Sequence, residues 1–198
     1  MNWAYKELST FREGKSTIDS TAQNATARNL AEFISTTLTN EGYYIARYEA
    51  SGTTSKITSK YNQAVLGNIT QPEAAQLTRE MYGEVKENNE LIYASDLINS
   101  YAWDTAIVYI QAMGNSNYAN ANRGTNTSLK NTGSTGDEKC KIFDMAGNTS
   151  EWTTEYRTDT SSSRAYPCTF RGGDYGHSNY FTSFRPVSYT HLTLPTIA

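Results

Sequence analysis

The chain is poor in the residues that build metal and redox sites. Its 198 residues include 2 cysteines and 2 histidines. The cysteines, Cys140 and Cys168, stand far apart with no CxxC pair, so a zinc site of the usual ligand spacing is excluded. Two cysteines allow a disulfide if neighbouring strands carry them, or two buried free thiols, and the sequence leaves both open.

Charge and long apolar runs are also scarce. Charged residues make up 19% of the chain and the formal net charge is −3. Such a chain is too weakly charged, and of the wrong sign, to bind phosphates, so we expect no nucleic-acid partner. No run of about 18 apolar residues occurs, and the first six residues hold no apolar signal region, so we expect no transmembrane segment and no signal peptide. The pattern is compatible with the C-terminal part of a longer surface protein.

Tyrosine, by contrast, is abundant, with 15 residues. Its rigid ring with a polar tip is favoured on recognition surfaces, and it also suits β-sheets, so both roles stay open. Hydrophobic periodicity and turn residues then define the expected elements. They are a helix over 30–38, a strand over 43–50, a loop over 51–69, helices over 70–86 and 95–113, a long loop over 114–138, and short strands thereafter. This order predicts an α+β domain in which Trp103 and Trp152 are buried in one core.

Three stretches, in order, resemble the formylglycine-generating-enzyme/sulfatase-modifying-factor superfamily. They are YYIARYEA at 43–50, DMAGNTSEWT at 144–153, and FRGG at 170–173, which closes with FRP at 184–186. The resemblance implies an α+β, C-type-lectin-like fold with two main helices, a small twisted antiparallel sheet and long loops. It also divides the chain into a polar segment with one helix (1–40), the domain (41–186) and a tail (187–198). The composition changes abruptly at this tail, which resembles a translated sequencing adapter, so we expect it to be non-native.

The motif residues are expected to be mainly structural. Gly147 permits a tight turn through a positive φ, Trp152 anchors the core, and Gly172 and Gly173 let two backbones approach closely. Arg171 can bind loop carbonyls or pair with a carboxylate such as that of Glu151. The family's first tryptophan in the turn motif is Ser150 here.

The resemblance also supplies a test for enzymatic activity. Oxidases of this superfamily hold copper with two cysteines just after the RGG motif, and the segment 174–183 contains none. A branch that uses non-haem iron needs a histidine cluster, whereas His177 stands alone. We therefore expect no copper or iron site and no catalytic residue, with a formylglycine-generating oxidoreductase as the alternative.

The segment 174–183 instead has a paratope-like composition. Aromatic residues alternate in it with short polar ones, a mixture that suits adaptable recognition. The expected ligand-binding residues are Asp174, Tyr175, His177, Asn179, Tyr180 and Phe181. The resemblance places them on a bacterial or phage cell-surface module, extracellular, that binds a protein or a glycan through a loop that can be diversified.

Calcium is the one cofactor that the resemblance favours. Family members bind it near the GN-x-x-E turn through hard oxygen ligands, and Asn148 and Glu151 match that motif. In the alternative, both side chains only form hydrogen bonds within the turn.

Overall fold

The computed structural model describes most of the chain. The described residues are 5–7, 30–82, 84–88, 90–122, 128–157, 168–185, 187–188 and 196–197. The helices are α1 (Leu30–Thr39), α2 (Gln71–Tyr82) and α3 (Ser100–Ala112), with a 3₁₀ turn, η2, at Tyr118–Asn120. The strands are β1 (Tyr5–Glu7), β2 (Ser51–Thr53), β3 (Lys56–Thr58), β4 (Glu84–Glu87), β5 (Glu90–Ala94), β6 (Asp96–Leu97), β7 (Glu138–Lys139), β8 (Ile142–Phe143), β9 (Glu151–Arg157), β10 (Cys168–Arg171), β11 (Val187–Ser188) and β12 (Thr196–Ile197).

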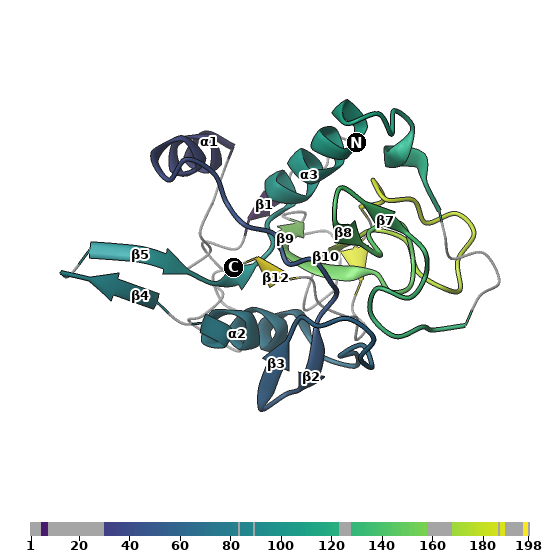
Figure 1. Cartoon of the computed structure of the whole chain (residues 1–198), viewed down its shortest axis with the longest axis horizontal. Coiled ribbons are helices and arrows are strands. Elements are labelled where there is room, and N and C mark those ends of the chain that lie inside the picture. Colours follow the sequence, from purple (N-terminus) through teal and green to yellow (C-terminus); the bar gives the residue numbers. More distant parts are fainter. Residues whose placement is uncertain are drawn as a thin grey trace.

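A small antiparallel sheet lies at the centre of this arrangement. Its four strands run in the order β1-β9-β10-β11, and β9 pairs with β10 so that Trp152 lies opposite Phe170. Helix α3 lies on one side of these strands and α2 on the other, while the β4–β5 hairpin projects away from the body (Figure 1). Helices and short antiparallel sheets confirm the α+β class. Within the part of the chain that the structure describes, no helix has the length and apolarity to cross a membrane.

The start of α2 follows from its sequence. Thr70 and Glu73 form the expected capping box, in which Oε2 of Glu73 accepts a hydrogen bond of 2.7 Å from the backbone N–H of Thr70. The helix ends at Tyr82, four residues earlier than expected. There Oγ of Ser95 accepts from the backbone N–H of Tyr82 and donates to the carbonyl of Arg79, which caps the last turn.

Helix α3 begins five residues later than expected. Residues 96–97 form β6, and Asn99 caps the helix by accepting a hydrogen bond of 2.8 Å from the backbone N–H of Ala102. Asn99 follows the apolar residues 97–98 and precedes Ser100, and this preferred capping residue was the sequence signal that could have located the start of the helix. The helix buries Trp103 and Ile110, whereas Val108 is exposed.

The expected strand over 43–50 is wrong. This segment is extended but irregular, with a bend at Arg47 and Tyr48, and the strand that follows it in the chain is β2. In place of a ladder, its backbone makes isolated hydrogen bonds to the N–H groups of Leu66 and Phe143 and to the side chain of Ser59. Oγ of Ser59 donates to the carbonyl of Tyr48 (2.8 Å) and accepts from its N–H (3.3 Å). The aromatic residues with a spacing of two therefore did not indicate sheet pairing, and only Glu49 and Ala50 of this segment are buried.

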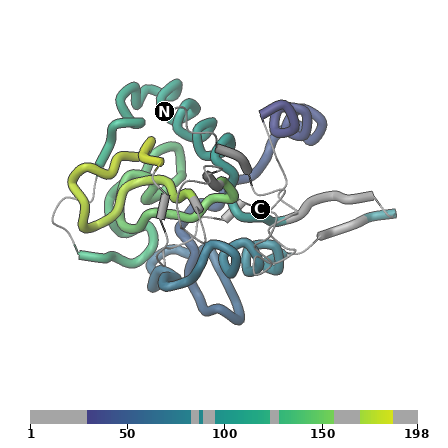
Figure 2. The backbone as a smooth tube through the Cα atoms, turned by 180° about the vertical axis from the view of Figure 1, so that it is seen from behind, coloured from purple at the N-terminus to yellow at the C-terminus, as the bar shows by residue number. Residues whose placement is uncertain are grey.

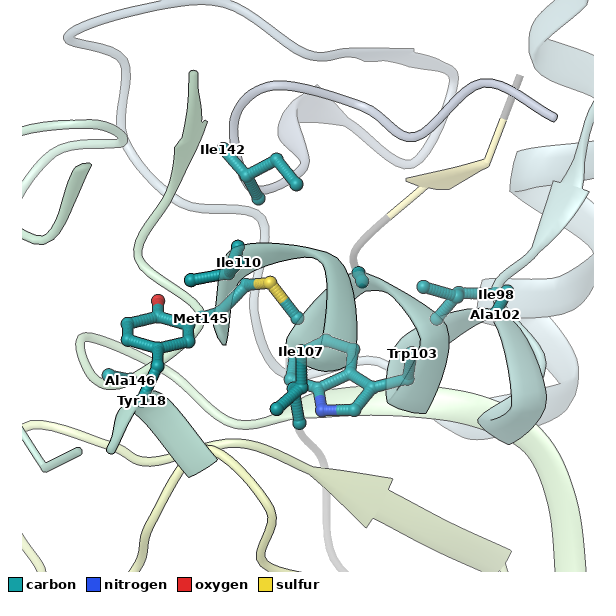
Figure 3. Close-up of a cluster of buried hydrophobic side chains, with 10 residues drawn as sticks. Ile98, Ala102, Trp103, Ile107, Ile110, Tyr118, Ile142, Met145 and Ala146 are labelled. Atoms are coloured by element: carbon teal, nitrogen blue, oxygen red, sulfur yellow. The ribbon is translucent and has the colours of Figure 1, made fainter. Parts of the chain in front are cut away.

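The two tryptophans are both buried, as expected, but they do not share one core. Trp152 belongs to a cluster between the sheet and α2, together with Leu97 and Phe170. Trp103 belongs to a second cluster, in which α3 packs against Tyr118, Met145 and Ala146 (Figure 3). The physical reason is that β9 presents polar residues to α3: Oγ of Ser100 meets Thr153 and donates to the carboxylate of Glu155.

The two expected loops contain more structure than their composition indicates. The segment 51–69 holds the β2–β3 hairpin. The described residues of the segment 114–137 are irregular apart from η2, yet Tyr118 and Asp137 within it are buried, and the hydroxyl of Tyr118 donates to Oδ2 of Asp137 at 2.8 Å. Residues 123–127 lie outside the described residues. Polar side chains thus form a buried network in a segment that we expected to lack core residues.

Candidate functional site

The turn that carries the GN-x-x-E motif is held by left-handed backbone on either side of its glycine. Asp144 and Asn148 both have φ of 66°, a conformation that Asn and Asp adopt more readily than other non-glycine residues. The sequence predicted that Gly147 would supply the positive φ, and this is wrong, because the φ of Gly147 is not positive and Asp144 and Asn148 take the left-handed conformation instead. The backbone N–H of Gly147 donates to the carbonyl of Asp144 at 3.2 Å, which closes the turn.

Asn148 links three distant segments through this turn. Its Nδ2 donates to Oε2 of Glu49 at 2.6 Å and to the carbonyl of Lys130 at 3.2 Å, and its Oδ1 accepts from the N–H of Lys130 at 2.8 Å. Its own carbonyl accepts from the N–H of Tyr175 at 2.9 Å. Both amide protons are used, and the side chain is buried. Asn148 is therefore a structural crosslink between residue 49, the long loop and the segment 174–183.

Glu49 is a buried carboxylate that the sequence reasoning did not single out. Besides Asn148, it accepts hydrogen bonds from the backbone N–H and the hydroxyl of Thr149. Burial raises the pKa of Glu49 well above its usual range, and the charge of Asp144 raises it further, although these hydrogen bonds oppose the shift. Its position at the end of the YYIARYEA stretch was the signal that could have identified it.

Glu151 lies in the same buried acidic region. Burial raises the pKa of Glu151 well above its usual range, and the charges of Glu49, Asp144 and Asp137 act in the same direction. Oε2 of Glu151 and Oδ1 of Asp137 are buried and have no hydrogen-bond partner among the described residues. Buried carboxylate oxygens of this kind are costly unless a proton or a cation compensates them.

The RGG glycines lie against this carboxylate. Gly172 has φ of 83°, and a Cβ atom there would lie 2.8 Å from Oε2 of Glu151 and 2.9 Å from the carbonyl oxygen of Met145. A Cβ atom at Gly173 would lie 2.5 Å from the carbonyl oxygen of Ala146. The close backbone approach expected at both glycines is present. One carboxylate oxygen and main-chain carbonyls therefore converge beside the turn.

Arg171 does not pair with Glu151, its cross-strand neighbour. Its Nη2 instead binds the carboxylate of Asp104 on α3. Burial lowers the pKa of Arg171, although the charge of Asp104 opposes this effect. Arg171 thus connects the sheet to α3. Arg185, in the closing FRP stretch, similarly binds the buried carboxylate of Glu155 with two nitrogen atoms.

The segment 174–183 is irregular and mostly exposed. Oδ1 of Asp174 accepts from the backbone N–H groups of Gly176 and His177, both at 2.8 Å, and the Asp174 carboxylate contacts Nδ1 of His177 at 2.7 Å. Tyr175 and Phe181 are 42% and 40% exposed. An aspartate-centred turn therefore holds the loop while two aromatic rings remain partly open to solvent.

Tyr180 differs from the other expected binding residues because it turns inward. Its ring stacks on that of Phe184 (centroids 4.1 Å apart) and on that of His177 (4.3 Å apart). Phe184 packs against Phe170, which meets Trp152 edge to face. Tyr180 is therefore an anchor that joins the exposed loop to the core, and Asn179 stays exposed beside it.

The long loop lies beside this segment, as expected. Nδ2 of Asn122 donates to the carbonyl of His177 at 3.0 Å, and the N–H of Thr182 donates to the carbonyl of Ala121 at 3.0 Å. Seen from behind, residues 168–185 and 128–150 gather at the same end of the molecule (Figure 2). The described parts of both loops thus form one face.

Two further observations bear on redox and metal chemistry. Cys140 carries a free thiol, which decides for this residue between the two alternatives, whereas the side chain of Cys168 lies outside the described residues. Among the residues that the structure describes, no three His, Cys, Asp or Glu side chains are grouped as a metal site. Four buried acidic residues therefore lie in one region without forming a metal-binding cluster of carboxylates. They are Glu49, Asp137, Asp144 and Glu151.

The comparison with known families agrees with these features. A family model described as the sulfatase-modifying factor enzyme 1-like domain matches residues 17–193. No curated protein and no solved structure matches the chain. The match covers most of the chain, including the turn, the RGG glycines and the segment 174–183. The domain limits of 41 and 186, and the non-native origin of 187–198, stay predictions.

Proposed function

Because the chain belongs to the sulfatase-modifying factor enzyme 1-like family, we propose that its C-type-lectin-like fold acts as a non-catalytic ligand-binding module. The observation that carries the proposal is the segment 174–183. The carboxylate of Asp174 holds its backbone through hydrogen bonds, and the ring of Tyr180 packs on Phe184. The same segment presents Tyr175 and Phe181 to solvent. Rigidly held aromatic rings among short polar residues lose little entropy when a partner buries them.

The polar side chains of the same face complete the binding surface. His177 and Asn179 are exposed beside the two open rings, and the long loop borders them through Asn122. A protein or glycan ligand of a bacterial or phage surface protein fits this chemistry, since it offers apolar patches and hydroxyl groups together. Because the backbone of the loop is held by Asp174 and by Ala121, exposed positions can vary in sequence while the fold persists. This is what a diversified binding loop requires, and it supports the proposal of a recognition module that acts outside the cell.

The binding experiment uses the two open rings. Tyr175→Ala and Phe181→Ala, singly and together, should abolish capture on arrays of glycans and bacterial surface proteins while the melting temperature stays unchanged. Tyr82→Ala is the matched control, because Tyr82 is 52% exposed on α2. Anchors of this type often contribute about 2 kcal/mol or more to binding. Equal capture by the double variant and the Tyr82 control would refute the proposal.

Family membership favours oxidation of a cysteine substrate as the second candidate function. The copper-binding cysteine pair of such oxidases would follow Gly173, and residues 174–183 supply no thiol there, so the chain does not fit the metal at that position. The protein, supplied with copper and a Cys-x-Pro-x-Arg peptide, should give no formylglycine by mass spectrometry above the blank. Turnover above it would replace the binding proposal with the oxidase.

Calcium is proposed as a structural ion beside the turn. Glu151 would supply Oε2, which has no partner among the described residues, and the carbonyl oxygen of Met145 lies against the same side of Gly172. Carboxylate and carbonyl oxygens are the ligands that calcium prefers. Asn148, whose amide already binds Lys130 and Glu49, would shape the site by fixing the turn.

A further inference from the structure

A cavity opens on a part of the molecule that the binding face does not use. It has a volume of about 430 Å³, within the range of small-molecule pockets. It lies between α3, the irregular segment 43–47 and the turn that joins β7 to β8. Its walls are largely apolar, with Tyr43, Ile45, Ala106, Tyr109 and Ile142 among them.

The polar lining of this cavity is cationic. Arg47 and Lys141 are its charged residues, and no carboxylate is among the lining residues. Nζ of Lys141 lies 2.8 Å from Oε1 of Glu138, in an ion pair that is mostly exposed to solvent. Arg47 takes part in no salt bridge shown within the described part of the chain. In a protein of net charge −3, such a pocket attracts an anionic group.

The walls are held in place before any ligand binds. The hydroxyl of Tyr43 donates to the carbonyl of Ala102 at 2.9 Å, and the N–H of Phe143 donates to the carbonyl of Arg47 at 3.0 Å. Cys140 and Lys141 form the two-residue turn between β7 and β8, with φ of 56° and 66°. Turns of this geometry usually contain Asn or Gly, so the chain places a thiol and an ammonium group here at a conformational cost.

We propose that this cavity binds a small aromatic carboxylate, with its ring between the apolar walls and its carboxylate at Arg47 and Lys141. A planar guanidinium presents paired N–H groups that match a carboxylate. The pocket is large enough for one ring with its substituents, and Thr105 and Cys140 offer small polar contacts at its edge. This site is independent of the segment 174–183.

Cys140 supplies a reporter inside the site. An aromatic disulfide that carries carboxylates, dithiobis(nitrobenzoate), is compared with the neutral dithiodipyridine on the intact chain. In either reaction the Cys140 thiolate attacks one sulfur of the reagent, a mixed disulfide forms, and the aromatic thiolate leaves. Peptide mass spectrometry follows the modification of Cys140 and separates it from that of Cys168. The rate ratio of anionic to neutral reagent should fall roughly fivefold in Arg47→Gln and stay unchanged in Lys56→Gln, an equal charge change outside the cavity.

A protection experiment distinguishes binding from simple charge attraction. Hydroxybenzoate should slow the reaction of Cys140 with dithiodipyridine in a saturable way, and neutral hydroxybenzamide at the same concentration should not. Arg47→Gln should weaken this protection. Absence of saturable protection, or an unchanged rate ratio in Arg47→Gln, would overturn the proposal, and melting temperatures of both variants verify that they are folded.

Discussion

Nδ2 of Asn148 donates a hydrogen bond of 2.6 Å to Oε2 of Glu49, across 99 residues of sequence. The bond joins the first family-like stretch to the second and is fully buried. Asn148→Asp would replace this donor with a second carboxylate that faces Glu49. We expect a loss of about 3 kcal/mol or more in the free energy of unfolding, measured by urea denaturation. Asn117→Asp, at an exposed position, should cost less than about 0.5 kcal/mol, and a similar loss in both variants would contradict this assignment.

The buried carboxylates predict an unusual dependence of stability on pH. Burial raises the folded-state pKa values of Glu49, Asp144 and Glu151 above those of the unfolded chain. The folded protein therefore holds protons that the unfolded chain releases. Their contribution to stability is fully present below the unfolded values, near pH 4, and is lost as the pH rises through the folded values. In chelator, we expect the melting temperature to fall from about pH 5 to pH 8.

A conservative variant assigns this slope to one group. Glu151→Gln removes the titration and keeps the shape, so the melting temperature should depend less on pH than in the parent. Glu138→Gln, on the exposed β7, should retain the parent slope. A parent melting temperature that rises between pH 5 and pH 8, or an unchanged slope in Glu151→Gln, would contradict this assignment.

Calcium should act through the same carboxylate. If Glu151 is a ligand, calcium binds the folded state only and stabilises it by mass action. At a free concentration one hundred times the dissociation constant the gain is about 2.7 kcal/mol, or roughly 5–10 °C in melting temperature for a chain of this size. The gain should vanish in Glu151→Gln and persist in Glu138→Gln. No shift between chelator and millimolar calcium in the parent would remove the site.

Gly172 allows strain and steric contact to be separated. Gly172→Ala places a methyl group against Glu151 and Met145 at a φ of 83°. Gly114→Ala imposes similar backbone strain at a φ of 99°, but its Cβ would meet nothing within 4 Å. We expect a cost of about 1 kcal/mol for Gly114→Ala and of about 3 kcal/mol or more for Gly172→Ala, from thermal unfolding. Equal costs would mean that the turn yields to the added methyl group.

The sequence predicted those features of the fold that depend on residues close together in the chain or on the size of a single side chain. The capping box of Thr70 and Glu73 fixed the start of α2 because both partners lie within one turn of the helix. The motif tryptophan was identified as buried because its size leaves few alternatives. The strand over 43–50 was wrong because its hydrogen-bond partner, Ser59, lies in a polar stretch with no pattern of its own.

The candidate site depended more on tertiary contacts. The sequence placed Asn148 and Glu151 in a functional turn, but the contact of Asn148 with Lys130 arises from a loop that no periodicity describes. The sequence offered Arg171 either loop carbonyls or a carboxylate such as that of Glu151, and the approach of α3 supplied Asp104 instead. The ring of Tyr180 packs on Phe184, whereas that of Tyr175 is partly open to solvent. The composition of the segment could not distinguish these two positions.

This division between Tyr180 and Tyr175 gives the last prediction. Tyr180→Ala removes the stack on Phe184 and the ring contact with Phe170, which connect the loop to the core, and it should lower the free energy of unfolding by about 2–4 kcal/mol. Tyr180→Phe keeps the stacks and should cost less than about 1 kcal/mol. Tyr175→Ala should leave stability within about 0.5 kcal/mol of the parent, because its ring is partly open to solvent. Chemical denaturation of the three variants measures this order. A loss in Tyr175→Ala as large as that in Tyr180→Ala would show that both rings belong to the core, and the proposed binding surface would then lose its principal aromatic residue.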